Sequence, residues 1–164
     1  MASTAFPSFT TSLQLSLRAA VAAGLSILVA QLLGLQYPLY AMISAVIVTD
    51  LEASKTRKLG LPRLIGTVLG GALGAIICTL LDPGVLAVSV GILLAMFISS
   101  LMEQRDAAKV AGYVSAIVLL DHNADPWIYS FHRTLETLLG IGVALLVSFV
   151  PKLLPSGDGA SKTT

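Results

Sequence analysis

Hydrophobic residues fill almost the whole chain, in long runs separated by short polar breaks. Six apolar segments can be delimited, at 13–33, 39–51, 63–81, 85–102, 107–120 and 132–153. A helix needs about 20 residues to cross the hydrocarbon of a bilayer, and four of the segments approach this length. The pattern therefore predicts an all-α integral membrane protein with six transmembrane helices.

Little of the chain remains outside these segments. The sequence predicts a polar lead-in at 1–12, a membrane domain at 13–154 and a polar tail at 155–164. Of the 164 residues 55% are hydrophobic and 12% charged, about half the usual roughly 25% charged. Mean hydropathy is +0.88. So few charges do not cover the surface of a soluble domain, and the lipid bilayer is the simpler solvent.

Cationic residues are distributed unequally between the two sets of loops. One side collects Lys55, Arg57, Lys58, Arg105, Lys109 and Lys152. The other side carries Arg133 together with Asp82, Asp121 and Asp125. Because Lys and Arg accumulate in cytoplasmic loops, we expect a multi-pass protein of the inner or plasma membrane with both termini in the cytoplasm.

Parts of the sequence recur about 70 residues apart. Residues 44–50 match 115–121 at an offset of 71. At an offset of 70, Arg63, Thr67 and Gly70 match Arg133, Thr137 and Gly140. These matches predict two three-helix repeats, at about 13–81 and 85–154. Since each holds an odd number of spans, the repeats are inverted, an arrangement frequent in transporters whose path lies between the halves.

Glycines and polar residues mark the inner faces of the predicted helices. Gly66, Gly70 and Gly74 fall on one helix face, and their spacing favours close helix packing, as we also expect for Gly140. The substrate-path candidates are Arg18, Arg63, Thr67, Arg133 and Thr137. Arg63 and Arg133 are predicted to open their helices, where anchoring at the membrane surface is the alternative.

Three carboxylic acids are candidates for proton coupling. Asp50 and Asp121 end the two short segments, and Glu136 lies one turn after Arg133. A carboxyl group whose charge changes during transport is what such coupling requires. Solvation at a helix end is the alternative for these acids, and Glu136 is also placed to neutralise Arg133.

Several functions are not supported. The chain has no basic run for nucleic acid, and its one cysteine, Cys78, gives neither a disulfide framework nor a zinc site. A solvated loop explains the polar stretch at 121–125 as well as a metal does. We find no nucleophile–base pair, phosphate loop or cofactor motif, and therefore expect no enzyme, no cofactor and no metal.

Four sequence features together resemble the FUSC superfamily. They are the Leu17-Arg18-Ala19-Ala20 start of the first helix, the Gly34-Leu35 break, Arg63-x-x-Gly66-Thr67-x-x-Gly70 and Arg133-x-x-Glu136-Thr137-x-x-Gly140. That superfamily includes fusaric-acid-resistance-like proteins, aromatic acid exporters and plant malate transporters.

The resemblance implies export of organic anions, often aromatic carboxylates, from the cytoplasm. Larger members continue into a further domain after six helices, whereas this chain ends in a short tail. We therefore expect a homo-oligomer, most simply a dimer. The alternative is a non-transporting subunit or scaffold that packs against a partner membrane protein.

Overall fold

The computed structural model describes residues 9–82, 84–121 and 125–150, and this part of the chain is all helical. The six helices are α1 (Phe9–Leu32), α2 (Pro38–Val48), α3 (Ala53–Leu80), α4 (Val85–Leu101), α5 (Arg105–Leu120) and α6 (Pro126–Ser148). Their number and order are those predicted. Residues 1–8 of the predicted lead-in, the tail at 155–164, Lys152 and positions 122–124 lie outside the described residues.

Three of the helices, α1, α3 and α6, are long and apolar enough to cross a membrane. The apolar helices α2 and α4 are shorter. With 11 residues, α2 is about 16 Å long at 1.5 Å per residue, roughly half the thickness of the hydrocarbon.

Two helices begin well before the apolar runs that predicted them. α3 starts at Ala53 rather than at residue 63, and it continues through Pro62. α6 starts at Pro126 rather than at residue 132, because Pro126 suits a first helical position and the Asp125 side chain accepts a hydrogen bond from Ile128 N. An apolar run marks only the apolar part of a helix. The polar turns that precede it in α3 and α6 were therefore not predicted as helical.

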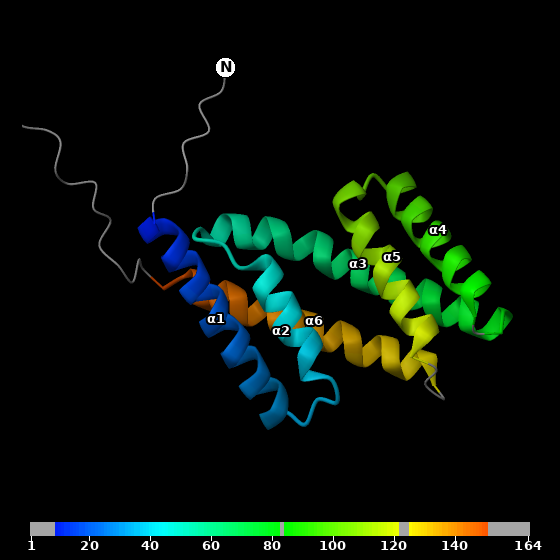
Figure 1. Ribbon diagram of the computed structural model, residues 1–164, viewed down its shortest axis with the longest axis horizontal. Helices are drawn as coiled ribbons and strands as arrows, with labels where there is room; N and C mark the ends of the chain where they lie inside the picture. Colours follow the sequence, from blue (N-terminus) through cyan, green and yellow to red (C-terminus); the bar gives the residue numbers. More distant parts are fainter. Residues whose placement is uncertain (1–8, 83, 122–124, 151–164) are drawn as a thin grey trace, which may run out of the picture.

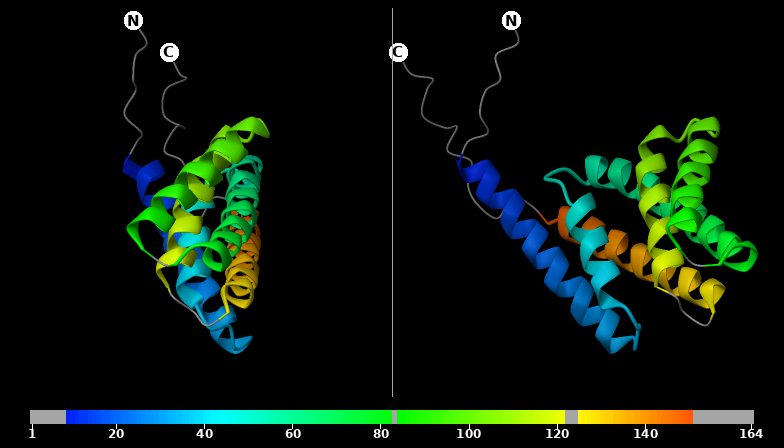
Figure 2. Two further views of the ribbon diagram at one scale, coloured as in Figure 1. Left: turned by 90° about the vertical axis from the view of Figure 1, so that its right-hand side faces the viewer. Right: turned by 45° about the vertical axis from the view of Figure 1, so that its right-hand side comes forward.

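The centre of the molecule is formed by α3 and α6, which lie side by side and run antiparallel (Figures 1 and 2). Gly60 lies against Ile141 near one end, and Gly71 lies against Ser130 further along. The Ser130 hydroxyl donates to the Gly71 carbonyl at 3.0 Å. In Figure 1 the α1–α2 pair lies at one end of this central pair and the α4–α5 pair at the other.

Each central helix also packs against a short helix of the other half of the chain, α3 against α5 and α6 against α2. Gly70 meets the carbonyl oxygen of Ala111, and Gly140 meets that of Ala41. In both contacts the partners occupy positions that differ by 70 in sequence number. The α3–α5 contact continues in the same direction along both helices, since Gly74 meets Val118.

Small residues occupy the interior, and large apolar residues face outward. On α1 the buried positions include Ala22, Ser26 and Ala30, whereas Leu25 and Leu28 are exposed. Membrane helices associate through small residues in this way, because lipid covers their large apolar side chains. The burial pattern is therefore that of a helical membrane protein.

Candidate anion site

Three arginines are buried in the helix bundle, Arg18, Arg63 and Arg133, and the last two lie in the central helices. Arg63 is ten residues into α3 with 4% of its surface exposed, and Arg133 is seven residues into α6 with 2% exposed. The expectation that they open their helices was wrong, because both helices begin further upstream. Both still stand at the start of their apolar runs, so anchoring at the membrane surface stays the alternative for these two charges.

Arg63 is held by few contacts. Its Nε donates to Ser44 Oγ of α2 at 3.3 Å. The guanidinium lies over the ring of Tyr113 on α5, 5.3 Å from the centroid. The hydroxyl of Tyr113 is buried without a hydrogen-bond partner among the described residues. Hydrogen-bonding capacity on both residues therefore remains unused.

Arg133 rests on a group of tyrosines that we call the tyrosine cluster (Tyr37, Tyr40 and Tyr129). Its guanidinium lies 3.7 Å from the ring centroid of Tyr40, and Nη1 approaches the Tyr129 hydroxyl at 3.5 Å. The hydroxyls of Tyr40 and Tyr129 are hydrogen-bonded at 2.7 Å. The rings of Tyr37 and Tyr129 meet edge to face at 5.2 Å. The arginine is thus surrounded by aromatic groups.

Neither Arg63 nor Arg133 forms an ion pair with another described residue. Within the described part of the chain the one salt bridge joins Lys55 to Glu52 on the surface. A buried charge without an ion-pair partner costs several kcal/mol, so both arginines favour the approach of a negative charge. For Arg133, the buried acid Glu136 one turn along α6 is one source of such a charge.

Glu136 is the one proposed proton-coupling acid that lies in the interior. It is 0% exposed, and its Oε1 accepts a hydrogen bond from Tyr37 N at 2.7 Å. Its Oε2 has no partner among the described residues. Asp50 lies half-buried in the connection between α2 and α3, and Asp121 is exposed at the end of α5.

Arg18 has different surroundings. Its guanidinium donates to the carbonyl of Leu51 at 2.8 Å and to that of Val150. These carbonyls follow the C-terminal ends of α2 and α6, where a cation is favoured. Arg18 therefore joins three segments of the chain, and it does not share the aromatic surroundings of Arg63 and Arg133.

The remaining site residues face the interior of the helix bundle. Thr67 and Thr137 are buried one turn beyond the two arginines, and Thr67 Oγ1 donates to the Arg63 carbonyl at 2.9 Å. Gly66 packs against Val110 of α5, next to the contacts already described for Gly70 and Gly74. The sequence grouped Tyr37, Tyr40 and Tyr129 on one side of the membrane but gave them no role in the site, because aromatic residues near membrane surfaces are common.

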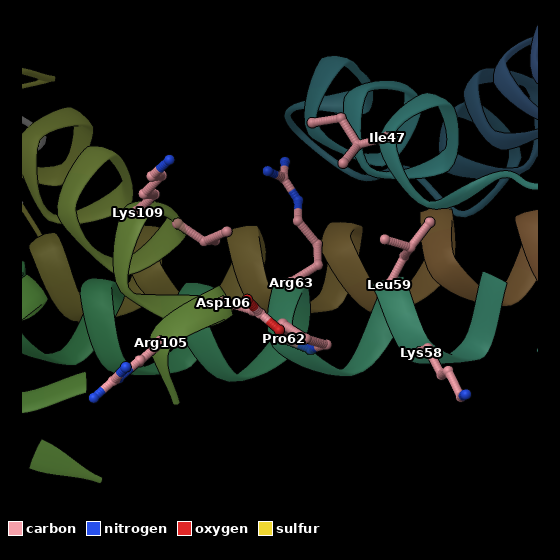
Figure 3. Close-up of a pocket in the computed structure, with 9 residues that line it drawn as sticks. Ile47, Lys58, Leu59, Pro62, Arg63, Arg105, Asp106 and Lys109 are labelled. Carbon is pink, nitrogen blue, oxygen red and sulfur yellow. The ribbon is translucent and has the colours of Figure 1, made fainter. Parts of the chain in front are cut away.

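A cavity of about 420 Å³ opens beside Arg63, between α2, α3 and α5 (Figure 3). Its lining includes Ile47, Leu59, Lys109 and Val110. Figure 3 shows the guanidinium of Arg63 and the side chain of Lys109 pointing to the same side of α3. A buried cation is thus accessible from this cavity.

The sequence profile of the fusaric acid resistance protein-like family matches residues 25–147, from within α1 to near the end of α6. The chain belongs to this family. The match includes both buried arginines, Glu136 and the cavity. No curated protein and no solved structure matches the chain.

Membership of this family indicates a protein related to membrane transport or efflux. Membership agrees with the three long apolar helices and with the small-residue interior. The chain is therefore a helical membrane protein of a transport-related family.

Proposed function

We propose that the protein moves organic anions, aromatic carboxylates above all, out of the cytoplasm. One observation carries the proposal. Arg63 and Arg133 are buried on adjacent antiparallel helices, and neither has a carboxylate partner in the described part of the chain. A passing carboxylate would supply the missing negative charge through charge-assisted hydrogen bonds.

The tyrosines around the arginines support an aromatic substrate. The tyrosine cluster lies at Arg133, and Tyr113 lies at Arg63. An aromatic ring that follows its carboxylate to either arginine would meet other rings edge to face or offset, the arrangements that aromatic groups prefer. A small aliphatic anion would gain nothing from these rings.

The wider arrangement that we propose is a six-span domain of two inverted repeats, with both termini cytoplasmic. The paired contacts of Gly70 and Gly140 support the repeat, and antiparallel α3 and α6 support the inversion. Short helices at matching places are typical of a transport path, as α2 and α5 are here. A homodimer in the inner or plasma membrane completes the proposal.

Glu136 is our first choice for proton coupling, ahead of Asp50 and Asp121. It is buried close to Arg133, and one of its oxygens has no partner among the described residues. Protonation there would change the charge beside the proposed path. The other two acids lie at helix ends, Asp50 half-buried and Asp121 exposed.

Efflux from liposomes tests the proposed function. Purified protein is reconstituted, and release of preloaded 4-hydroxybenzoate and malate is compared for the wild type, Arg63→Gln and Arg133→Gln. Because each change removes a charge-assisted contact worth about 1.5–3 kcal/mol, we expect at least tenfold slower efflux of 4-hydroxybenzoate. The matched control is Arg57→Gln, which removes an exposed cation from the same helix.

Two results would count against the proposal. Equal flux in all four proteins would remove both arginines from the path. No flux from well-folded wild-type protein, with another membrane protein copurifying, would favour the scaffold alternative instead.

A further inference from the structure

The cavity beside Arg63 has the features of a binding site for a small ligand. We propose that it binds a carboxylate carried on a compact apolar body, with the carboxylate between Arg63 and Lys109. The site rests on the proposed function, for which it would be the place where the anion is loaded before it reaches Arg133.

The cations that line the cavity do not all face it in the same way. Figure 3 shows Arg63 and Lys109 pointing to the same side of α3, where Ile47 of α2 also lies. The side chains of Lys58 and Arg105 point to the opposite side of α3. Two of the four lining cations are thus placed to meet one ligand.

Arg63 provides the specific contact. It is 4% exposed, and among the described residues its one hydrogen bond is the 3.3 Å contact from Nε to Ser44. Its two terminal nitrogens therefore keep their donors available. A guanidinium with this freedom binds a carboxylate through two parallel hydrogen bonds.

Lys109 adds a second, exposed charge to the lining of the cavity. It is exposed on α5 and has no ion pair with another described residue. Its ammonium group is a compact charge on a flexible stem, suited to following an anion as it enters. Asp106 is the one acidic lining residue, and its carboxylate lies beside Pro62 in Figure 3.

The remaining walls select the body of the ligand. Ile47, Leu59 and Val110 are apolar, so they bind a ring or a short branched chain better than a second carboxylate. The volume of about 420 Å³ falls within the range of roughly 300–1,000 Å³ usual for small-molecule sites. We therefore expect 4-hydroxybenzoate to bind more tightly than malate.

Equilibrium dialysis of labelled 4-hydroxybenzoate against the full chain in phosphatidylcholine nanodiscs tests the site. Lys109→Gln should weaken binding about tenfold, the effect of losing a hydrogen bond to a charged group. The control Arg105→Gln removes a cation from the same helix and cavity but on the other side of α3, and it should change binding less than twofold. Ile47→Trp, which fills the apolar part, should also weaken binding without changing any charge.

Three outcomes would overturn the site. The first is an equal loss of ligand binding in Lys109→Gln and Arg105→Gln, and the second is unchanged binding in Ile47→Trp. The third is binding that is abolished in phosphatidylglycerol nanodiscs, since a lipid headgroup would then be the natural anion. Flux measured beside binding separates the two proposals. Lys109-dependent binding without flux contradicts the transport function alone, whereas normal flux and binding in Lys109→Gln contradict the site alone.

Discussion

The two buried arginines rest on tyrosine rings at different distances. Arg133 is 3.7 Å from the centroid of Tyr40, whereas Arg63 is 5.3 Å from that of Tyr113. Attraction to the face of a ring weakens with distance, so Arg133 is the more firmly held of the two. In the proposed path, Arg63 is then the cation that adjusts to an arriving anion and Arg133 is the fixed one.

The contact between Arg133 and Tyr40 can be measured by removing the ring. Tyr40→Leu loses both the ring and the hydrogen bond to Tyr129, whereas Tyr40→Phe loses the hydrogen bond alone. A cation–π contact away from water is worth about 2 kcal/mol. We expect Tyr40→Leu to unfold at a clearly lower temperature than Tyr40→Phe in detergent; equal unfolding temperatures would mean that the ring does not hold Arg133.

At the scale of the helices, the close contact of Gly140 with the backbone of α2 determines how α6 packs on α2. A Cβ at Gly140 would collide with the carbonyl of Ala41, which belongs to the backbone and has no freedom to move aside. The neighbouring Gly142 has open space around the same position. The two glycines thus differ in packing although they lie on one helix.

Alanine at each of these glycines gives a matched pair of variants. Gly140→Ala must separate α6 from α2, and overpacking of this kind costs about 1–3 kcal/mol. Gly142→Ala meets no neighbour and gains up to about 1 kcal/mol of helix propensity. Thermal unfolding in detergent should therefore show a loss of stability for Gly140→Ala alone; similar stability for both variants would contradict the close contact.

The sequence predicted the order of the helices and singled out Arg63 and Arg133, but it did not predict what surrounds these two arginines. Runs of apolar residues gave the order of the six helices, and the rarity of arginine in such runs identified Arg63 and Arg133. The contact of Tyr40 and Tyr129 with Arg133 was missed because the sequence does not say which helix faces which. The partners of Arg18 are backbone carbonyls, which no residue type reveals, and its place in the path stays a prediction.

On the scale of the whole molecule, the proposed topology places alternate connections on opposite sides of the membrane. Single cysteines in a Cys78→Ser background test this, since Cys78 is the only cysteine. We expect an impermeant maleimide added outside intact cells to label Gln36→Cys and Asp82→Cys. Ser54→Cys and Gln104→Cys should react only after permeabilisation, and external labelling of either would contradict the six-span arrangement.

The packing of α3 on α5 and of α6 on α2 also affects how the protein is made. A ribosome completes α3 well before it reaches α5, so the glycine face of α3 and the charge of Arg63 enter the bilayer without their final neighbours. Until α5 emerges, lipid or an insertion factor must cover that face. Slow translation between the two helices would lengthen the interval in which a membrane protease can degrade the unfinished chain.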